Sequence, residues 1–137
     1  MDQPIAVTRD LELDMSPDEL WSLVGDGDRW PEWMVDQATV EVAPGRGGTV
    51  HDRGVDRDVF VREVAEGERV AFDWWERARP DVISTVELVV APTATGAGLR
   101  IIETFPAAPA VVTARADAAW SVRSVGLWLR GRVRVLA

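Results

Sequence analysis

The fold of this chain is decided by residues 7–33, VTRDLELDMSPDELWSLVGDGDRWPEW. Val7, Leu11 and Leu13 alternate there with polar residues, which predicts a half-buried β-strand. Ser16 is a preferred N-cap, and Pro17 after it suits the first position of a helix. A short amphipathic helix follows, and Gly25 ends it. We therefore expect a strand that leads into a capped helix and then into a tryptophan-rich loop.

Beyond residue 33 the chain carries turn signals about every ten residues, which is typical of an antiparallel meander. The segments between these turns have the alternation of strands, and we predict six of them, near residues 38–42, 49–53, 59–64, 70–76, 83–90 and 99–105. With the strand at the start, the sheet is expected to have about seven strands.

The period then changes. An apolar stripe at three- and four-residue spacing predicts a long C-terminal helix, through Val111, Ala114, Ala118, Val122, Val125 and Leu129. About 20 helical residues span about 30 Å, enough to cross a whole sheet. The sequence thus predicts one α+β domain over residues 1–137, a curved antiparallel sheet wrapped on this helix, with two short helices after the first strand.

Composition excludes several classes of function. The 137 residues carry a formal net charge of −8, which argues against nucleic-acid binding, although residues 115–137 are basic. That basic segment pairs with the acidic body or contacts an acidic partner. Cysteine is absent, so there is no disulfide framework and no thiolate nucleophile. No apolar run is long enough for a membrane span, and no signal-peptide pattern is present, so we expect a cytoplasmic protein.

Five further segments agree in register with one known superfamily. They are Pro44-Gly45-Arg46-Gly47-Gly48, the run EGERVAFDWW at 66–75, STVEL at 84–88, LRIIE at 99–103, and Trp120. Together with the opening stretch they resemble the SRPBCC (START-like) superfamily, in its bacterial branch related to activators of the heat-shock chaperone ATPase (AHSA-type). One departure is Thr104-Phe105-Pro106, where that superfamily usually continues Ser-Gly-Phe.

This resemblance implies a helix-grip fold with a hydrophobic cavity between the sheet and the C-terminal helix. Strand alternation sorts the side chains into two faces, and the more apolar set is assigned to the interior. The predicted ligand-binding residues are Phe72, Trp74, Val86, Leu88, Ile101 and Glu103 from the strands, with Ala114, Ala118 and Val122 from the helix.

Glu103 is the sharpest single candidate, because it shares a face with Leu99 and Ile101. A buried carboxylate is costly unless it is hydrogen-bonded or paired. Two interpretations stay open. In one, Glu103 orients a ligand or acts as a general acid or base. In the other, it is structural, bonded to Trp74 or paired with an arginine such as Arg53 or Arg115.

Other residues with reactive side chains are interpreted as structural. His51 is the only histidine, and without partners of its kind it indicates neither a catalytic triad nor a metal site. Asp26-Gly27-Asp28 and the glycines at 45–48 are expected to be turns. Trp21, Trp30 and Trp33 are expected to brace the short helices against the sheet. No cofactor and no metal are predicted.

Three functions follow from these patterns and the resemblance. The first is non-catalytic binding of a small, mostly hydrophobic molecule in the cavity. The second is an enzyme of the polyketide-cyclase type, in which Glu103 moves protons with help from Arg53 or Ser84. The third is a protein-interaction module of the chaperone-activator or repressor-partner type. That module would use the outer sheet face with Trp75 as an anchor, and an exposed Trp75 and Trp128 would favour a homodimer.

Overall fold

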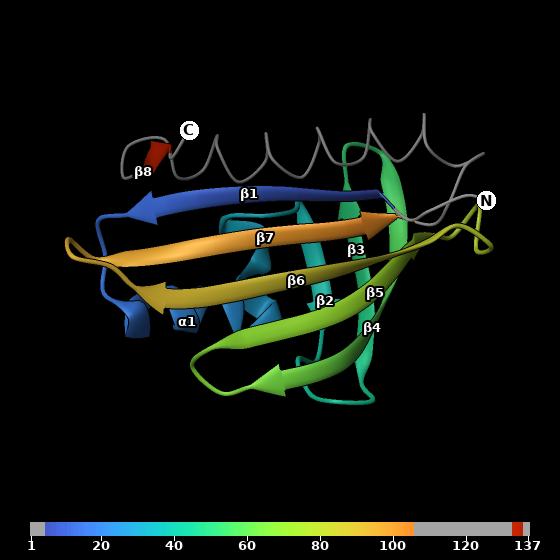
Figure 1. The fold of residues 1–137 in the computed structure, drawn as a ribbon. Coiled ribbons are helices and arrows are strands. Elements are labelled where there is room, and N and C mark those ends of the chain that lie inside the picture. The colour runs from blue at the N-terminus through green and yellow to red at the C-terminus, as the bar shows by residue number, and fades with distance from the viewer. Residues whose placement is uncertain (1–4, 106–132, 136–137) are drawn as a thin grey trace.

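The computed structural model describes residues 5–105 and 133–135 of the chain, and within them it confirms an antiparallel α+β architecture. The strands form one sheet in the order β2-β3-β4-β5-β6-β7-β1-β8 (Figure 1). The strands are β1 (Ile5–Leu13), β2 (Gln37–Val40), β3 (Gly47–Asp52), β4 (Val55–Ala65), β5 (Arg69–Glu76), β6 (Ile83–Pro92), β7 (Ala97–Phe105) and β8 (Val133–Val135).

The opening stretch folds as its sequence predicts. Helix α1 (Pro17–Val24) is capped by Ser16, whose hydroxyl accepts the backbone N–H of Glu19 at 3.1 Å. The Glu19 carboxylate in turn accepts the backbone N–H of Ser16 at 3.3 Å. This reciprocal capping box satisfies two backbone donors that a helix start otherwise leaves unpaired. Gly25 is the C-cap.

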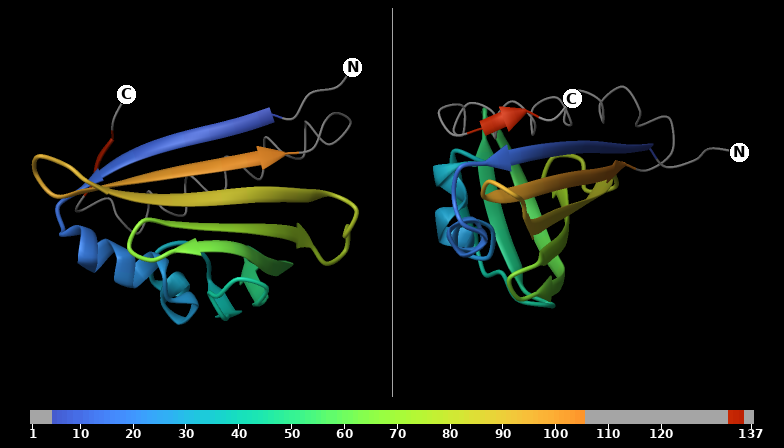
Figure 2. Two further views of the ribbon diagram at one scale, coloured as in Figure 1. Left: turned by 60° about the horizontal axis from the view of Figure 1, so that its bottom comes forward. Right: turned by 60° about the vertical axis from the view of Figure 1, so that its left-hand side comes forward.

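A short 3₁₀ helix, η1 (Gly27–Glu32), follows and is fixed to α1 by tryptophans. The indole N–H groups of Trp30 and Trp33 donate to the backbone carbonyls of Val24 and Leu23, each at 3.0 Å. Both side chains are buried. These bonds join the two short helices to each other, and the ring contact of Trp30 with Phe72 of β5 agrees with the predicted bracing against the sheet. Figure 2 shows α1 and η1 together on one side of the sheet.

Two features of the sheet differ from the sequence prediction. Strand β4 begins at Val55 rather than near residue 59, and a bulge interrupts its pairing with β5 between Val61 and Glu63. The short strand β8 was not predicted, and it pairs with Leu11–Leu13 of β1. The predicted long helix, with Ala114, Ala118 and Val122, lies outside the described residues.

The hairpin between β3 and β4 turns through two residues of positive φ, Arg53 at 53° and Gly54 at 79°. Such a pair is what a tight turn between twisted antiparallel strands requires. The backbone N–H of Arg53 donates to Asp36 Oδ2 at 3.0 Å. The prediction that Arg53 supplies a polar group to the interior is therefore wrong, because its side chain is exposed at this turn.

Within the described part of the chain, none of the helices has the length and apolar character needed to cross a membrane.

Candidate ligand-binding site

The sheet has an inner face, defined by the side chains that alternation assigns to the interior. All of the predicted inward-facing residues of β5, β6 and β7 are buried: Val70, Phe72, Trp74, Ser84, Val86, Leu88, Val90, Leu99, Ile101 and Glu103. The opposite, outer face carries the ion pairs Arg100–Asp10 at 2.7 Å and Arg77–Asp58 at 3.1 Å. The predicted inner set is therefore buried as expected, although Ala71 and Asp73 on the other face of β5 are buried as well.

One part of the inner face is filled by the aromatic residues of η1 and β5. The ring of Trp30 lies 5.0 Å from that of Phe72, and Phe72 lies 5.4 Å from Trp74 in an edge-to-face arrangement. Phe72 and Leu88 are completely buried, and both belong to the main hydrophobic core. These two predicted ligand contacts are thus core residues in the structure, and any ligand contact by them stays a prediction.

The polar side chains of the inner face gather beside Trp74. Arg57, Ser84 and Glu103 are only 5%, 7% and 3% exposed. In the sheet register Trp74 of β5 lies opposite Ser84 of β6. Glu103 of β7 lies opposite the next inward residue of β6, Val86. Neighbouring strands therefore bring a hydroxyl, an indole and a carboxylate together.

Glu103 accepts two hydrogen bonds on the same oxygen. The indole N–H of Trp74 and the hydroxyl of Ser84 both donate to Glu103 Oε2, each at 3.0 Å. The predicted hydrogen bond between Glu103 and Trp74 is confirmed, and a role of Glu103 toward a ligand stays a prediction. Arg53 is not a partner in this cluster, and Arg115 lies outside the described residues. These bonds fix the orientation of the carboxylate and compensate for its burial.

Arg57 is a site residue that sequence reasoning missed. Its guanidinium carbon lies 5.2 Å from the centre of the Trp74 ring, which is a cation–π arrangement. The residue shares the inner face with Val59 and Val61 and lies opposite Glu76 of β5. An alternation in the sequence indicates that Arg57 faces the same side as Val55 and Val59. The prediction missed it because the fourth strand was expected to begin only near residue 59.

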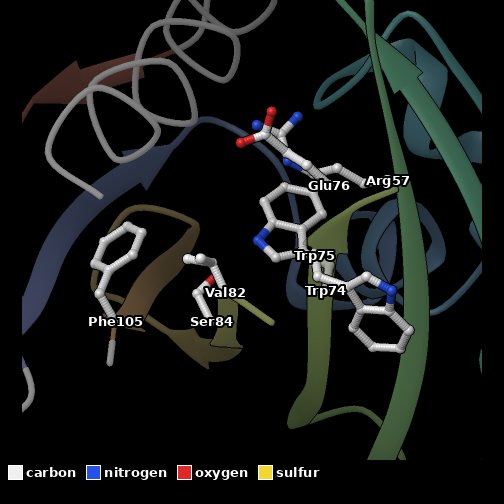
Figure 3. A pocket seen from close by; sticks show the side chains of 7 residues that line it. All are labelled: Arg57, Trp74, Trp75, Glu76, Val82, Ser84 and Phe105. Carbon is white, nitrogen blue, oxygen red and sulfur yellow. The ribbon is translucent and has the colours of Figure 1, made fainter. Parts of the chain in front are cut away.

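A small pocket lies at this cluster (Figure 3). Its volume is about 10 Å³, about the minimum that admits one water molecule. The lining residues combine aromatic rings with a few polar groups: Arg57, Trp74, Trp75, Glu76, Val82, Ser84 and Phe105. Trp75, predicted as an exposed anchor, is half-buried and contributes to this wall. The pocket is large enough for one polar group of a ligand and too small for its body.

A second, open groove of about 420 Å³ shares Glu76 with this pocket. Its other lining residues come from the β3–β4 turn, the start of β4 and the two residues that follow β5: Gly54, Val55, Asp56, Arg77 and Ala78. Nearby, His51 Nδ1 lies 2.6 Å from Asp56 Oδ1, and the hydrogen bond from His51 lowers the pKa of Asp56. His51 is 40% exposed, as predicted for a surface residue.

A further buried carboxylate, Asp52, was also missed. It is 3% exposed, and its Oδ2 atom has no hydrogen-bond partner. Burial raises the pKa of Asp52, and the negative charge of Asp36 raises it further. Among the described residues, no three His, Cys, Asp or Glu side chains cluster as a metal site requires.

Solved structures with the same fold span almost the whole chain. Protein MLL2253 from Mesorhizobium loti has a TM-score of 0.68 at 20% identity, over 93% of this chain and 97% of that one. CalU16 from Micromonospora echinospora has a TM-score of 0.67 at 17% identity, over 93% and 76% of the two chains. DynU16, from the dynemicin biosynthetic locus, has a TM-score of 0.68 at 21% identity, over 95% and 47%.

No curated protein matches this sequence significantly. A family model does match, over residues 4–133, and it describes polyketide cyclases, dehydrases and lipid transport proteins. This match and the solved structures confirm the predicted SRPBCC-type fold family. The chain therefore belongs to the polyketide cyclase / dehydrase and lipid transport family.

Proposed function

We propose that this protein binds a small, mostly hydrophobic molecule on the inner face of its sheet and does not transform it. The observation that carries the proposal is a cluster of buried polar groups beside Trp74, on the mainly apolar inner face of β4 to β7. Arg57, Ser84 and Glu103 are the polar members, and Trp74 joins them. Small-molecule sites are typically apolar surfaces with a few fixed polar groups that set orientation.

Family membership supports the same proposal, because its model includes lipid transport as well as polyketide chemistry. CalU16 and DynU16 share the fold at 21% identity or less, so they indicate no particular ligand. In the proposed complex, the apolar body of the ligand lies against Trp74 and Ile101, and its polar end points toward Ser84.

Non-catalytic binding is favoured by the hydrogen bonds of Glu103. A general base accepts a proton from its substrate, but Glu103 Oε2 already accepts from Trp74 and Ser84. Both donors are neutral side chains in fixed positions on neighbouring strands. Such an arrangement suits a carboxylate that holds an indole and a hydroxyl in place for a ligand.

A polyketide-cyclase activity is the second candidate, and one observation favours it. Arg57 and Ser84 line the same pocket beside the hydrogen-bonded Glu103. A cationic donor next to a carboxylate is an arrangement that stabilises an enolate while a proton is transferred. In that case Glu103 exchanges one of its present partners for the substrate.

A protein-interaction role has its own observation, on the outer face. Phe60 and Ile83 are 40% and 44% exposed there, and the guanidinium of Arg62 lies over the ring of Phe60. The AHSA-type resemblance suggests that a protein partner, or a second copy of this chain, binds to this face.

A thermal-shift screen separates these roles. The wild-type protein is heated with a panel of aromatic polyketides, fatty acids and sterols. The same panel is applied to Ser84→Ala and to a matched control, Ile83→Thr, which alters the adjacent residue on the opposite face of the sheet. We expect one compound class to stabilise the wild type saturably, by about 2.7 kcal/mol at a hundredfold excess over Kd. Ser84→Ala should weaken this effect, and Ile83→Thr should not.

Mass spectrometry of the bound compound then distinguishes binding from catalysis. Non-catalytic binding is supported if the compound is recovered from the native complex with unchanged mass. It is also supported if a polyketone keeps its mass after long incubation with the protein. Loss of water from the polyketone that stops in Glu103→Gln supports the cyclase. No stabilisation by any class of the panel contradicts the proposed ligand binding and favours a protein partner.

A further inference from the structure

The pocket beside Glu103 has a defined pattern of hydrogen-bond donors and acceptors. Ser84 has one hydroxyl hydrogen, and it is donated to Glu103 Oε2 at 3.0 Å. A hydroxyl oxygen that has given away its hydrogen can only accept from other groups. Ser84 therefore offers an acceptor to any molecule that enters the pocket.

Trp74 is committed in the same way. Its single N–H also points to Glu103, at 3.0 Å, which leaves the ring itself as a wall of the pocket. Phe105 and Val82 add further apolar surface. This apolar surface favours an aromatic ring, rather than a charged group, as the part of the ligand next to the pocket.

The two remaining polar residues that line the pocket differ in whether they donate or accept hydrogen bonds. The side chain of Arg57 carries only N–H donors. Glu76 carries only acceptors when ionised, and it is ion-paired with Arg79. A group in this pocket thus meets donors on the side of Arg57 and acceptors on the side of Ser84 and Glu76.

We propose that the ligand is an aromatic alcohol whose hydroxyl group occupies this pocket, accepting from Arg57 and donating to Ser84 or Glu76. This inference rests on the proposed function and specifies its ligand class. A hydroxyl is close to water in size, which matches the volume of about 10 Å³. A carboxylate is larger than a hydroxyl and has no hydrogen for the acceptors, and in this pocket it would lie beside Glu76 as well as Arg57. A ketone accepts but does not donate.

Three matched probes test this inference with the wild-type protein: 2-naphthol, 2-methylnaphthalene and 2-naphthoate, each titrated calorimetrically at neutral pH. Because an unpaired polar group inside a site lowers affinity strongly, we expect 2-naphthol to bind at least tenfold more tightly than 2-methylnaphthalene. The carboxylate 2-naphthoate should bind most weakly. In Ser84→Ala and Arg57→Gln the preference for 2-naphthol should fall, and in the control Ile83→Thr it should persist.

The outcomes separate this inference from the proposed function. Equal affinities for 2-naphthol and 2-methylnaphthalene, or tightest binding of 2-naphthoate, overturn the hydroxyl assignment while leaving apolar ligand binding in place. Failure of all three probes, when a fatty acid or sterol of the panel does bind, also overturns it. Because the comparison uses the wild type, a variant that does not fold leaves the test intact.

Discussion

The indole of Trp74 and the carboxylate of Glu103 are joined by a 3.0 Å hydrogen bond between residues 29 positions apart in the sequence. Ser84, on the strand between them, donates to the same oxygen. One carboxylate thus links β5, β6 and β7 on the inner face. Both donors are buried, so neither exchanges this bond for water at low cost.

Removal of the Glu103 carboxylate is expected to destabilise the protein markedly. Glu103→Ala leaves two buried donors without their acceptor, which costs about 2–4 kcal/mol of the free energy of unfolding. Glu103→Gln keeps an oxygen at the same place and should cost about 1 kcal/mol. Urea unfolding midpoints measure both. Equal losses for the two variants would show that the hydrogen bonds contribute nothing to stability.

Trp30 is expected to be the most sensitive tryptophan. Trp30→Phe removes the bond to the carbonyl of Val24 and loosens the contact with Phe72, at a cost of about 1–3 kcal/mol. The control is Trp21→Phe, since Trp21 lies on the neighbouring helix α1 and is only half-buried, and it should cost less than about 1 kcal/mol. A larger loss for Trp21 than for Trp30 in the same unfolding experiment would refute the bracing role.

The capping box of α1 can be tested at one position. Ser16→Ala removes the acceptor of the Glu19 backbone N–H and should cost about 1 kcal/mol. Ser16→Gly should cost only a few tenths, because glycine leaves that N–H open to water. Thermal unfolding of both variants gives the comparison, and an alanine variant as stable as wild type would contradict the predicted cap.

Asp52 should make stability depend on pH in the direction opposite to most carboxylates. Burial raises the pKa of Asp52 in the folded state above its ordinary value of 3.8, so the folded state holds this proton more tightly than the unfolded state. The contribution of Asp52 to the free energy of unfolding is therefore fully present below its ordinary pKa. It is lost as pH rises through the pKa of Asp52 in the folded state. Asp36 and Arg53 are the charged groups that act on Asp52.

Asp52→Asn removes this dependence. The free energies of unfolding of the wild type and the variant are compared from about pH 3 to pH 7. As pH rises, the asparagine variant should become more stable relative to the wild type. The comparison isolates Asp52 because carboxylates with a lowered pKa, such as Asp10 beside Arg100, titrate in both proteins. A difference that stays constant over this range would mean that Asp52 titrates normally.

Local signals were sufficient for most of the fold. Ser16, Pro17 and Gly25 lie at the helix ends because capping depends on neighbouring residues alone. Alternation placed Trp74 and Glu103 on one face, and the sheet then brought them together. The cluster itself could be anticipated for this reason, although its hydrogen-bond pattern could not.

The missed features depend on contacts between distant segments. The approach of Asp36 to Asp52 is set by the β3–β4 turn and the loop before β2, and no period in the sequence reports it. Strand β8 is short, and its pairing with β1 joins opposite ends of the chain. Arg57 is a charged residue within an otherwise apolar alternation, so the sequence pattern predicts this strand only from residue 59 onward.

The central claim is that a hydrophobic ligand binds beside Trp74, and the indole N–H signals in a ¹H–¹⁵N NMR spectrum test it most directly. The spectrum is recorded with and without the compound that most stabilises the protein in the thermal-shift panel, and Trp74→Phe assigns the signal. We predict that the Trp74 signal shifts saturably, while those of Trp30 and Trp33, bonded to the carbonyls of Val24 and Leu23, stay in place. An unmoved Trp74 signal at saturation would contradict the account.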